Sequence, residues 1–219
     1  PLLDSVHVLQ SRDEYCGLLG IAKEKKLVGV MPGSRIKEIR RLLPVFLEAA
    51  SSLQRQSKDD LCFIIPCAPT LTEQDLHESG LDALKGNLEI RVVHENRYEM
   101  MAACDVVIAA SGTVTLELLL VDTPMVVAYK VSPRTYQLGK LLVKVDFFSL
   151  VNLIGGEQIV PELFQEKANP ARISEELHRL LYDDAARTRI ADGFDRVKSM
   201  LGGPGASHRA AELAMTLIS

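Results

Sequence analysis

A short polar turn near the middle of the chain has residue types that suit the binding of an anion. The apolar run 105–110 is followed by Ser111, Gly112 and Thr113. This pattern indicates a strand that turns tightly into a helix, whose first backbone N–H groups lack intrahelical partners and carry partial positive charge. Glycine lets a phosphate approach the backbone closely. The turn therefore predicts a phosphate site, and a simple helix cap is the alternative.

An acidic residue one helical turn further on could bind a second group. Glu117 lies four residues after Thr113, so both side chains are expected on one face of the helix. A carboxylate there can accept two hydrogen bonds from a vicinal diol such as a ribose. A phosphate site and a diol acceptor one turn apart indicate a nucleotide, whereas a capped helix with a solvated glutamate is the alternative.

A second glycine-containing turn follows the apolar run 27–31 and contains Gly33, Ser34 and Arg35. The guanidinium of Arg35 can bind a phosphate through two parallel hydrogen bonds, which a lysine ammonium cannot do. A cation at a helix start is unfavourable against the helix dipole unless an anion offsets it. We therefore expect this turn to bind phosphate as well, the alternative being a surface arginine.

Composition and absent motifs exclude several classes of protein. Of the 219 residues, 47% are hydrophobic and 25% charged, which is typical of a globular domain, and the net charge of −4 gives no general attraction to nucleic acid. Neither GxxxxGK[ST] nor GxGxxG occurs, which argues against a P-loop NTPase and an ordinary NAD-dependent dehydrogenase. No CxxC and no His/Cys pair at zinc-finger spacing is present, and the resemblance described below implies neither metal nor cofactor. The cysteines are expected to be buried free thiols: Cys16, Cys62, Cys67 and Cys104.

Apolar runs alternate with helical patterns along most of the chain. Five runs rich in apolar residues are typical of strands in a buried parallel sheet: 27–31, 61–65, 88–93, 105–110 and 124–129. With right-handed crossovers they predict an α/β fold, a Rossmann-like doubly wound parallel sheet with trailing C-terminal helices. Ligands bind beyond the carboxyl ends of such strands, where both glycine-containing turns lie. Pro44 interrupts one helical pattern and predicts a kink or two abutting helices.

The same patterns predict how the chain is divided. Residues 1–26 are expected to be a linker with a short helix, and 27–168 a Rossmann-like nucleotide-binding domain, whose ligand the resemblance described below specifies as a UDP-sugar. Residues 169–219 are expected to be C-terminal helices that pack on this domain or on a partner domain. Asn169 and Pro170 suit the N-cap and first position of the first of these helices.

Two motifs and three later segments occur in an order that one enzyme family shares. The motifs are Met31–Arg35 with Glu38 and Ile39, and Ala110–Thr113 with Leu116 and Glu117. The segments are 124–129, 152–154 and 161–165. Together they resemble lipid-A-disaccharide synthase, a glycosyltransferase with the two-domain GT-B fold. The resemblance implies that this chain is the C-terminal, nucleotide-sugar-binding half.

The resemblance also implies an activity. The family transfers 2,3-diacylglucosamine from UDP onto 2,3-diacylglucosamine 1-phosphate and forms the lipid A disaccharide and UDP. The anomeric centre inverts, so a general base should activate the acceptor hydroxyl. That base is expected in a missing N-terminal domain, so this half would contain no catalytic residue and would be inactive alone. The family further implies no metal, a Gram-negative source, and a cytoplasmic location peripheral to the inner membrane.

Site residues follow from the resemblance by position. Two turns would hold the diphosphate: Gly33, Ser34, Arg35, Ser111, Gly112 and Thr113. Glu117 would hold the ribose, and the uracil would meet the backbone near Val93 and His94. Three further residues would lie at the donor site: Asn152, Glu162 and Gln165. Glu162 would equally suit the start of a helix.

The stretch from Tyr129 to Phe148 interleaves basic and apolar residues, and Lys140 and Lys144 would share a helix face. Such an element can lie on an anionic membrane or receive acyl chains, and the alternative is an amphipathic helix packed on the sheet. Two other function classes stay open. One is another UDP-sugar enzyme of similar fold, a 2-epimerase or a peptidoglycan glycosyltransferase, and the other is a non-catalytic nucleotide-binding module.

Overall fold

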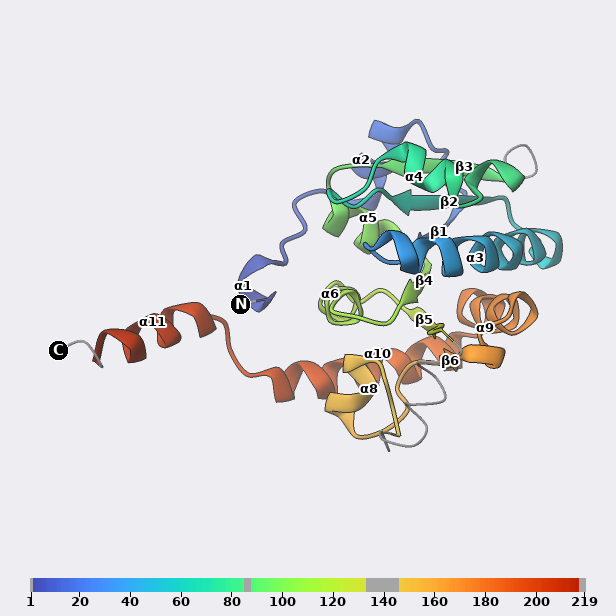
Figure 1. The fold of residues 1–219 in the computed structure, drawn as a ribbon. Helices are drawn as coiled ribbons and strands as arrows, with labels where there is room; N and C mark the ends of the chain where they lie inside the picture. Colours follow the sequence, from blue (N-terminus) through green and yellow to red (C-terminus); the bar gives the residue numbers. More distant parts are fainter. Residues whose placement is uncertain (1, 85–87, 133–145, 217–219) are drawn as a thin grey trace.

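The computed structural model describes residues 2–84, 88–132 and 146–216 and contains a six-stranded sheet (Figure 1). The strands are β1 (Lys26–Met31), β2 (Leu61–Pro66), β3 (Glu89–Val93), β4 (Val106–Ala110), β5 (Met125–Tyr129) and β6 (Glu162–Phe164). All neighbouring strands pair in parallel, in the order β3-β2-β1-β4-β5-β6. This order confirms the predicted doubly wound fold and places its switch point between β1 and β4.

Helices cover both faces of the sheet, as their mutual contacts show (Figure 1). One face carries α3 (Ile36–Gln56), α4 (Glu73–Glu78), the 3-10 helix η1 (Leu81–Leu84) and α9 (Pro170–Tyr182). The other carries α2 (Arg12–Leu19), α5 (Arg97–Ala103), α6 (Val114–Leu120), α8 (Leu150–Gly155) and α10 (Asp184–Leu201). The central strands are therefore buried on both sides, which explains their continuous apolar sequences.

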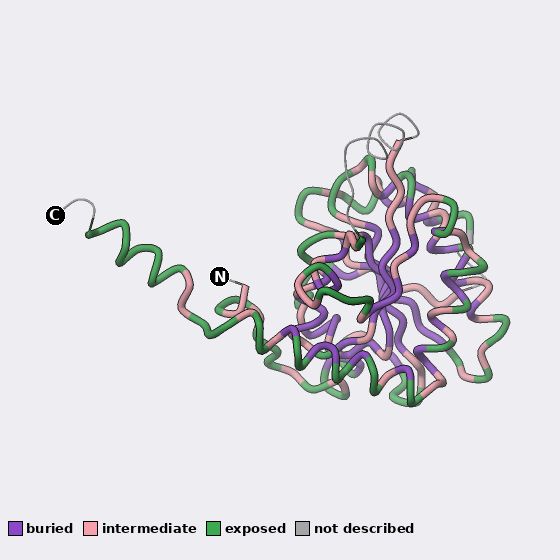
Figure 2. Tube along the Cα trace, turned by 90° about the horizontal axis from the view of Figure 1, so that it is seen from below, coloured by how far each residue is buried: buried purple, intermediate pink, exposed green. Residues whose placement is uncertain are grey.

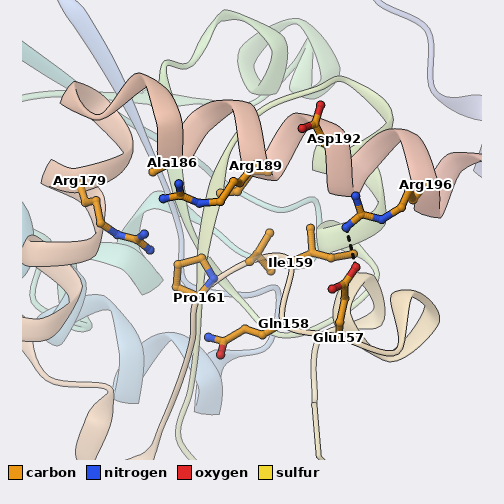
Figure 3. Close-up of a pocket in the computed structure, with 11 residues that line it drawn as sticks. Glu157, Gln158, Ile159, Pro161, Arg179, Ala186, Arg189, Asp192 and Arg196 are labelled. Carbon is orange, nitrogen blue, oxygen red and sulfur yellow. Dashed lines mark hydrogen bonds and ion pairs between the residues drawn. The ribbon is translucent and has the colours of Figure 1, made fainter.

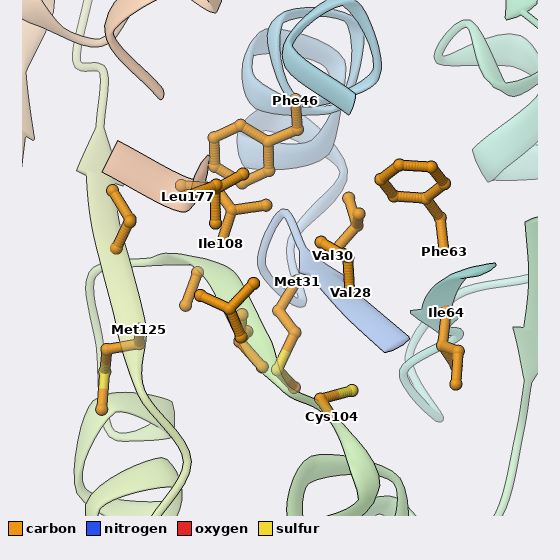
Figure 4. Packing of buried hydrophobic residues seen from close by; sticks show 14 of the residues in the cluster. Val28, Val30, Met31, Phe46, Phe63, Ile64, Cys104, Ile108, Met125 and Leu177 are labelled. Carbon is orange, nitrogen blue, oxygen red and sulfur yellow. The ribbon is translucent and has the colours of Figure 1, made fainter. Parts of the chain in front are cut away.

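Close packing at the switch point depends on a glycine. A Cβ added at Gly29 of β1 would lie 2.7 Å from Val107 Cγ2 of β4, which is nearer than real Cβ atoms come. A side chain there would therefore force apart the two strands whose ends carry both predicted turns. Figure 4 shows Val30 of β1 and Ile108 of β4 in the buried cluster, with Phe46 of α3 and Leu177 of α9 beside them.

The proline in the first crossover helix does not divide it. α3 is one helix of 21 residues with Pro44 inside, so the alternative of two abutting helices is wrong. A proline in a helix interior costs about 3 kcal/mol. Each fully buried Leu or Phe side chain contributes about 1.5–3 kcal/mol, and α3 buries several of them along the same face, including Leu43, Phe46 and Leu47. Packing on the sheet thus outweighs the proline.

The segment before β1 is more than a linker with a short helix, because it contains two helices. α1 (Leu2–Ser5) buries nothing, whereas α2 packs on α5 and buries Tyr15 and Cys16. Arg12 of α2 also donates a hydrogen bond of 2.9 Å to the Asp105 carboxylate at the start of β4. α2 therefore belongs to the folded core.

The C-terminal helices differ in how they are covered. Asn169 caps α9 by accepting a hydrogen bond of 3.0 Å from Arg172 N, and α9 packs on β4 and β5. α10 packs on α6, α8 and α9. α11 (Ala206–Thr216) has no buried residue and projects from the body, and Figure 2 shows it exposed along its length. Leu213 and Met215 are exposed apolar side chains on it.

Two features bear on contact with a membrane. Lys140 and Lys144 fall within 133–145, outside the described residues, so their common helix face stays a prediction. Among the helices that the structure describes, none is both long enough and apolar enough to cross a bilayer.

The cysteines are free and buried, as predicted.

Candidate functional site

The turns that follow β1, β2, β3 and β4 surround a cavity of about 700 Å³ at the carboxyl edge of the sheet. All the residues predicted to contact diphosphate, ribose and uracil line it: Gly33, Ser34, Arg35, Val93, His94, Ser111, Gly112, Thr113 and Glu117. Because β1 pairs directly with β4, the two glycine-containing turns meet although they are far apart in the sequence. The strand order thus assembles the site.

The turn after β1 is built around Gly33. Its φ of 111° is a conformation that favours glycine, and a Cβ there would lie 2.6 Å from Glu38 Oε2. The other Glu38 oxygen accepts a hydrogen bond of 2.9 Å from Arg35 Nη1. The Arg35 side chain is 81% exposed at the cavity. An exposed ion pair contributes little to stability, so Arg35 can exchange Glu38 for an anionic ligand.

The turn after β4 has open backbone at Gly112, and the hydroxyl groups of Ser111 and Thr115 on either side are bonded within the protein. Ser111 Oγ donates a hydrogen bond of 2.7 Å to the Phe148 carbonyl, and Thr115 Oγ1 donates one of 2.9 Å to the Gly112 carbonyl. A Cβ added at Gly112 would meet no protein atom within 4 Å, so the space beside it is open. In the first turn of α6, Thr115 N and Leu116 N already donate to the carbonyls of Gly112 and Thr113. The open space still lets a ligand oxygen approach the backbone at Gly112.

The predicted ribose acceptor is nearly buried and paired with a cation. The Glu117 side chain is 7% exposed, and its Oε1 accepts a hydrogen bond of 2.7 Å from Arg97 Nη2. Burial raises the pKa of the Glu117 carboxyl above its ordinary value, and the Arg97 guanidinium opposes that rise. Arg97 was not among the predicted site residues. No local pattern reveals it, because its contact with α6 exists only in the folded chain.

The predicted uracil contacts lie on the far side of the cavity from β4. Val93 ends β3, and its carbonyl already accepts a hydrogen bond of 2.8 Å from Cys67 N. The exposed His94 ring follows, with Nε2 at 2.7 Å from Glu73 Oε1 of α4. Their contact with a base stays a prediction. Among the described residues, no group of three or more His, Cys, Asp or Glu is placed to hold a metal ion.

The three residues predicted at the donor site do not line this cavity. Glu162 begins the strand β6 rather than a helix, so the alternative of a helix start is wrong. Its carboxylate accepts hydrogen bonds from Phe148 N (3.0 Å), Ser149 N (2.9 Å) and Ser149 Oγ (2.6 Å). Gln165, in the 3-10 helix η2 (Gln165–Lys167), accepts one of 2.8 Å from Val131 N. Their contact with a donor sugar stays a prediction.

Asn152 is the hub of this neighbouring network. Its residue is fully buried, and its Nδ2 donates to the Val160 carbonyl (2.9 Å) and Glu162 Oε1 (2.8 Å). Its Oδ1 accepts from Ile159 N (2.8 Å) and Val160 N (2.9 Å). All four hydrogen bonds of the amide are thus made within the protein. Asn152 and Glu162 thus hold α8 against β6.

A second cavity of about 420 Å³ lies where the chain enters β6 (Figure 3). Arginines from α9 and α10 surround it, and one of them, Arg196, donates a hydrogen bond of 2.5 Å to Glu157. It contains none of the predicted site residues and lies at the amino end of β6, away from the carboxyl ends where ligands of this sheet type bind. The cavity beside β1 and β4 is therefore the candidate site.

The sheet order is that of one half of the two-domain GT-B fold, and solved structures share this arrangement. Anabaena Alr3699/HepE, solved in complex with UDP and glucose, has the same fold, with a TM-score of 0.56, 13% identity, and coverage of 94% of this chain and 52% of that chain. The spinosyn rhamnosyltransferase SpnG, solved with thymidine diphosphate, gives a TM-score of 0.57 and 15% identity over 86% of this chain and 45% of that chain.

Sequence comparison gives the particular family. The model of the lipid-A-disaccharide synthetase family matches residues 1–215, and the chain belongs to that family. It is 43% identical over 219 residues to the lipid-A-disaccharide synthase of Trichlorobacter lovleyi, covering 100% of this chain and 56% of that protein. The predicted resemblance is thereby confirmed. The chain spans about half the length of the curated relatives it matches.

Proposed function

We propose that this chain is the donor-binding half of an inverting glycosyltransferase. The whole enzyme would move 2,3-diacylglucosamine from UDP to 2,3-diacylglucosamine 1-phosphate, giving the lipid A disaccharide and UDP. The observation that carries the proposal is the cavity at the β1–β4 switch point. It combines an exposed arginine, open glycine backbone and a buried carboxylate within one space. Membership in the family supports the choice of donor and acceptor.

In this proposal the diphosphate of UDP lies between the two glycine-containing turns. Arg35 exchanges Glu38 for phosphate oxygens, and Gly112 lets the diphosphate approach the start of α6. Negative charge grows on UDP as the bond to the sugar breaks, so donors fixed there stabilise the transition state. The ribose hydroxyls donate to Glu117, and the base lies towards Val93 and His94.

The remaining chemistry is assigned outside this chain. A base in an N-terminal half would deprotonate the acceptor hydroxyl, so this half alone would bind UDP without catalysing transfer. Arg35 and the backbone N–H groups would supply positive charge without a metal ion. The assembled enzyme would work in the cytoplasm, with peripheral contact to an anionic membrane that presents its lipid substrates.

Isothermal titration calorimetry with UDP in metal-free buffer tests the proposal. The parent chain is expected to bind UDP, and Arg35→Ala and Glu117→Ala are expected to bind at least about tenfold more weakly, since each removes a charged hydrogen bond. Lys37→Ala is the matched control, because Lys37 lies on α3 but does not line the cavity. Absence of UDP binding by the parent chain would contradict the proposal that this half carries a complete nucleotide site.

A further inference from the structure

The buried carboxylate of the cavity forms an ion pair with one arginine. Arg97 contacts Glu117 across the interface between α5 and α6, with the 2.7 Å hydrogen bond described above. The Arg97 side chain is 54% exposed, whereas that of Glu117 is 7% exposed. The carboxylate thus lies inside the protein while its counter-charge remains in contact with solvent.

Arg97 is held in this position by its neighbour in the helix. Its Nη2 also donates a hydrogen bond of 2.8 Å to the Tyr98 hydroxyl, and its guanidinium carbon lies 4.7 Å from the centroid of the Tyr98 ring. A cation over an aromatic ring at this distance is attracted to the ring face. The guanidinium is therefore fixed by two groups, the Glu117 carboxylate and the Tyr98 side chain.

The geometry leaves part of the carboxylate available. Only Oε1 of Glu117 receives a hydrogen bond from the part of the chain that the structure describes, and Oε2 has no partner there. A vicinal diol needs acceptors that are ionised and fixed in direction. By bonding to Oε1, Arg97 stabilises the negative charge of the Glu117 carboxylate and fixes its direction. The other oxygen, Oε2, then remains to accept a hydrogen bond from a ribose hydroxyl.

The other elements around Glu117 also carry charged or titratable groups. Of the helices that pack on α6, α8 carries no charged residue, and α10 directs Lys198 to Asp122, with a hydrogen bond of 2.5 Å. The strands β4 and β5 carry no charge. The remaining charged or titratable groups on the cavity wall are Arg35, Glu38, Cys67, His94 and Glu95, and α5 also carries the buried Glu99, which accepts a hydrogen bond of 3.3 Å from Leu9 N. Among the described residues, Arg97 alone forms an ion pair with Glu117.

We infer that Arg97 is a positioning residue of the nucleotide site, which keeps Glu117 ionised and oriented towards the ribose and so sets the pH range of nucleoside diphosphate binding. The inference rests on the proposed function. Without Arg97, burial acts on Glu117 unopposed and favours the protonated form. A protonated carboxyl has lost an acceptor site, so affinity falls as pH falls, by up to about tenfold per pH unit below the titration midpoint.

Two measurements on the same variants test the inference. The titration of the Glu117 carboxyl is followed by carbon-13 NMR, with Glu117→Gln to assign its signal, and UDP affinity is measured by calorimetry from pH 5.5 to pH 8. In Arg97→Met the carboxyl is expected to titrate at higher pH than in the parent, and UDP affinity to fall towards pH 5.5 more steeply. Arg97→Lys keeps the positive charge. Its Glu117 titration and the pH dependence of its UDP affinity are therefore expected to lie between those of the parent and of Arg97→Met.

Two controls isolate the pair. Arg97→Met added to Glu117→Gln is expected to change neither the affinity nor its pH dependence, because the group that Arg97 acts on is gone. His94 lines the same cavity, and histidine titrates in the same pH range. All variants are therefore also compared in a His94→Gln background, where the Arg97 effect is expected to persist.

Specific outcomes would overturn the inference. An Arg97→Met protein with an unchanged Glu117 titration, or with UDP affinity lowered equally at every pH, would show that Arg97 acts by direct contact or through folding. If the parent chain binds no UDP at any pH, the proposed function fails, and the carboxyl titration still decides whether Arg97 controls Glu117. Circular dichroism of each variant shows whether it is folded. If Arg97→Met is not folded, the same two measurements are made on Arg97→Lys instead.

Discussion

Asn152 donates a hydrogen bond of 2.8 Å to the Glu162 carboxylate, and this bond joins α8 to the edge strand β6. Both side chains also bond to neighbouring backbone, so the segment between them is fixed at several points. The site cavity borders this region, because Ser111 of the β4 turn bonds to the carbonyl of Phe148. A residue outside the cavity can thus affect the turn that would hold the diphosphate.

Replacing Asn152 by Ala is expected to lower the free energy of unfolding by about 3 kcal/mol, because it leaves buried backbone groups of Ile159 and Val160 without partners and removes one hydrogen bond from the Glu162 carboxylate. Urea denaturation followed by circular dichroism measures the change. Gln158→Ala is the matched control, since that amide is exposed, and it should stay close to the parent. A loss as small for Asn152→Ala as for the control would contradict the structural task assigned to Asn152.

Asn152→Asp places a second carboxylate against Glu162 in a buried site. Like charges raise the pKa values of such a pair in the folded state above those of the unfolded chain. A group whose folded pKa is raised contributes stability below that pKa and loses it as pH rises. We therefore expect Asn152→Asp to be more stable, relative to the parent, at pH 5 than at pH 8, and urea denaturation at both values checks the sign.

Gly112→Ala is expected to separate folding from binding. The added methyl group would meet no protein atom within 4 Å, so the melting temperature should change little. It would occupy space into which a phosphate is proposed to move, so UDP affinity should fall by at least about tenfold, which corresponds to about 1.4 kcal/mol. Gly17→Ala, equally open but in α2, is the control and should bind UDP as the parent does.

Arg35→Ala is expected to distinguish the phosphate part of the site from the nucleoside part. Loss of a charged hydrogen bond to phosphate should weaken UDP binding about tenfold and leave uridine binding unchanged. Competition calorimetry with UDP, UMP and uridine would measure this. Equal losses for UDP and uridine would mean that Arg35 shapes the cavity instead of binding the diphosphate.

The four thiols offer a test of the fold itself. All four are buried, and burial raises the pKa of the Cys62 thiol to about 11. The thiolate is the reactive form, so a thiol reagent at pH 8 should react slowly with the native chain and rapidly with four groups after unfolding. Rapid reaction of the reagent with Cys62 or Cys104 in the native protein would show that these thiols are less buried than the structure shows.

The sequence predicted most of the sheet because buried parallel strands carry a local signal. Five of the six strands lie within a residue or so of the predicted apolar runs. β6 was missed because it has only three residues, begins with Glu162 and gains its identity from pairing with β5. The alternative of two abutting helices at Pro44 was wrong for a related reason, since the packing that outweighs the proline is formed by distant segments.

The sequence predicted the residues that line the cavity better than the residues that hold those side chains in place. The two glycine-containing turns could be found because glycine, polar caps and a following helix are adjacent in the sequence. The pairing of Arg97 with Glu117 and of Asn152 with Glu162 joins side chains from different elements. Sequence patterns alone cannot show which charged or amide groups become buried together.

The central place of β1 in the sheet has a consequence for the order of folding. β1, β2 and β3 can pair as soon as the first half of the chain exists, yet that half holds only one of the two glycine-containing turns. The site is completed when β4 docks along the free edge of β1. A nucleotide that binds only the complete site would therefore stabilise the chain with β4 paired to β1 over states in which β4 is unpaired. Pairing of β4 would in turn strengthen nucleotide binding.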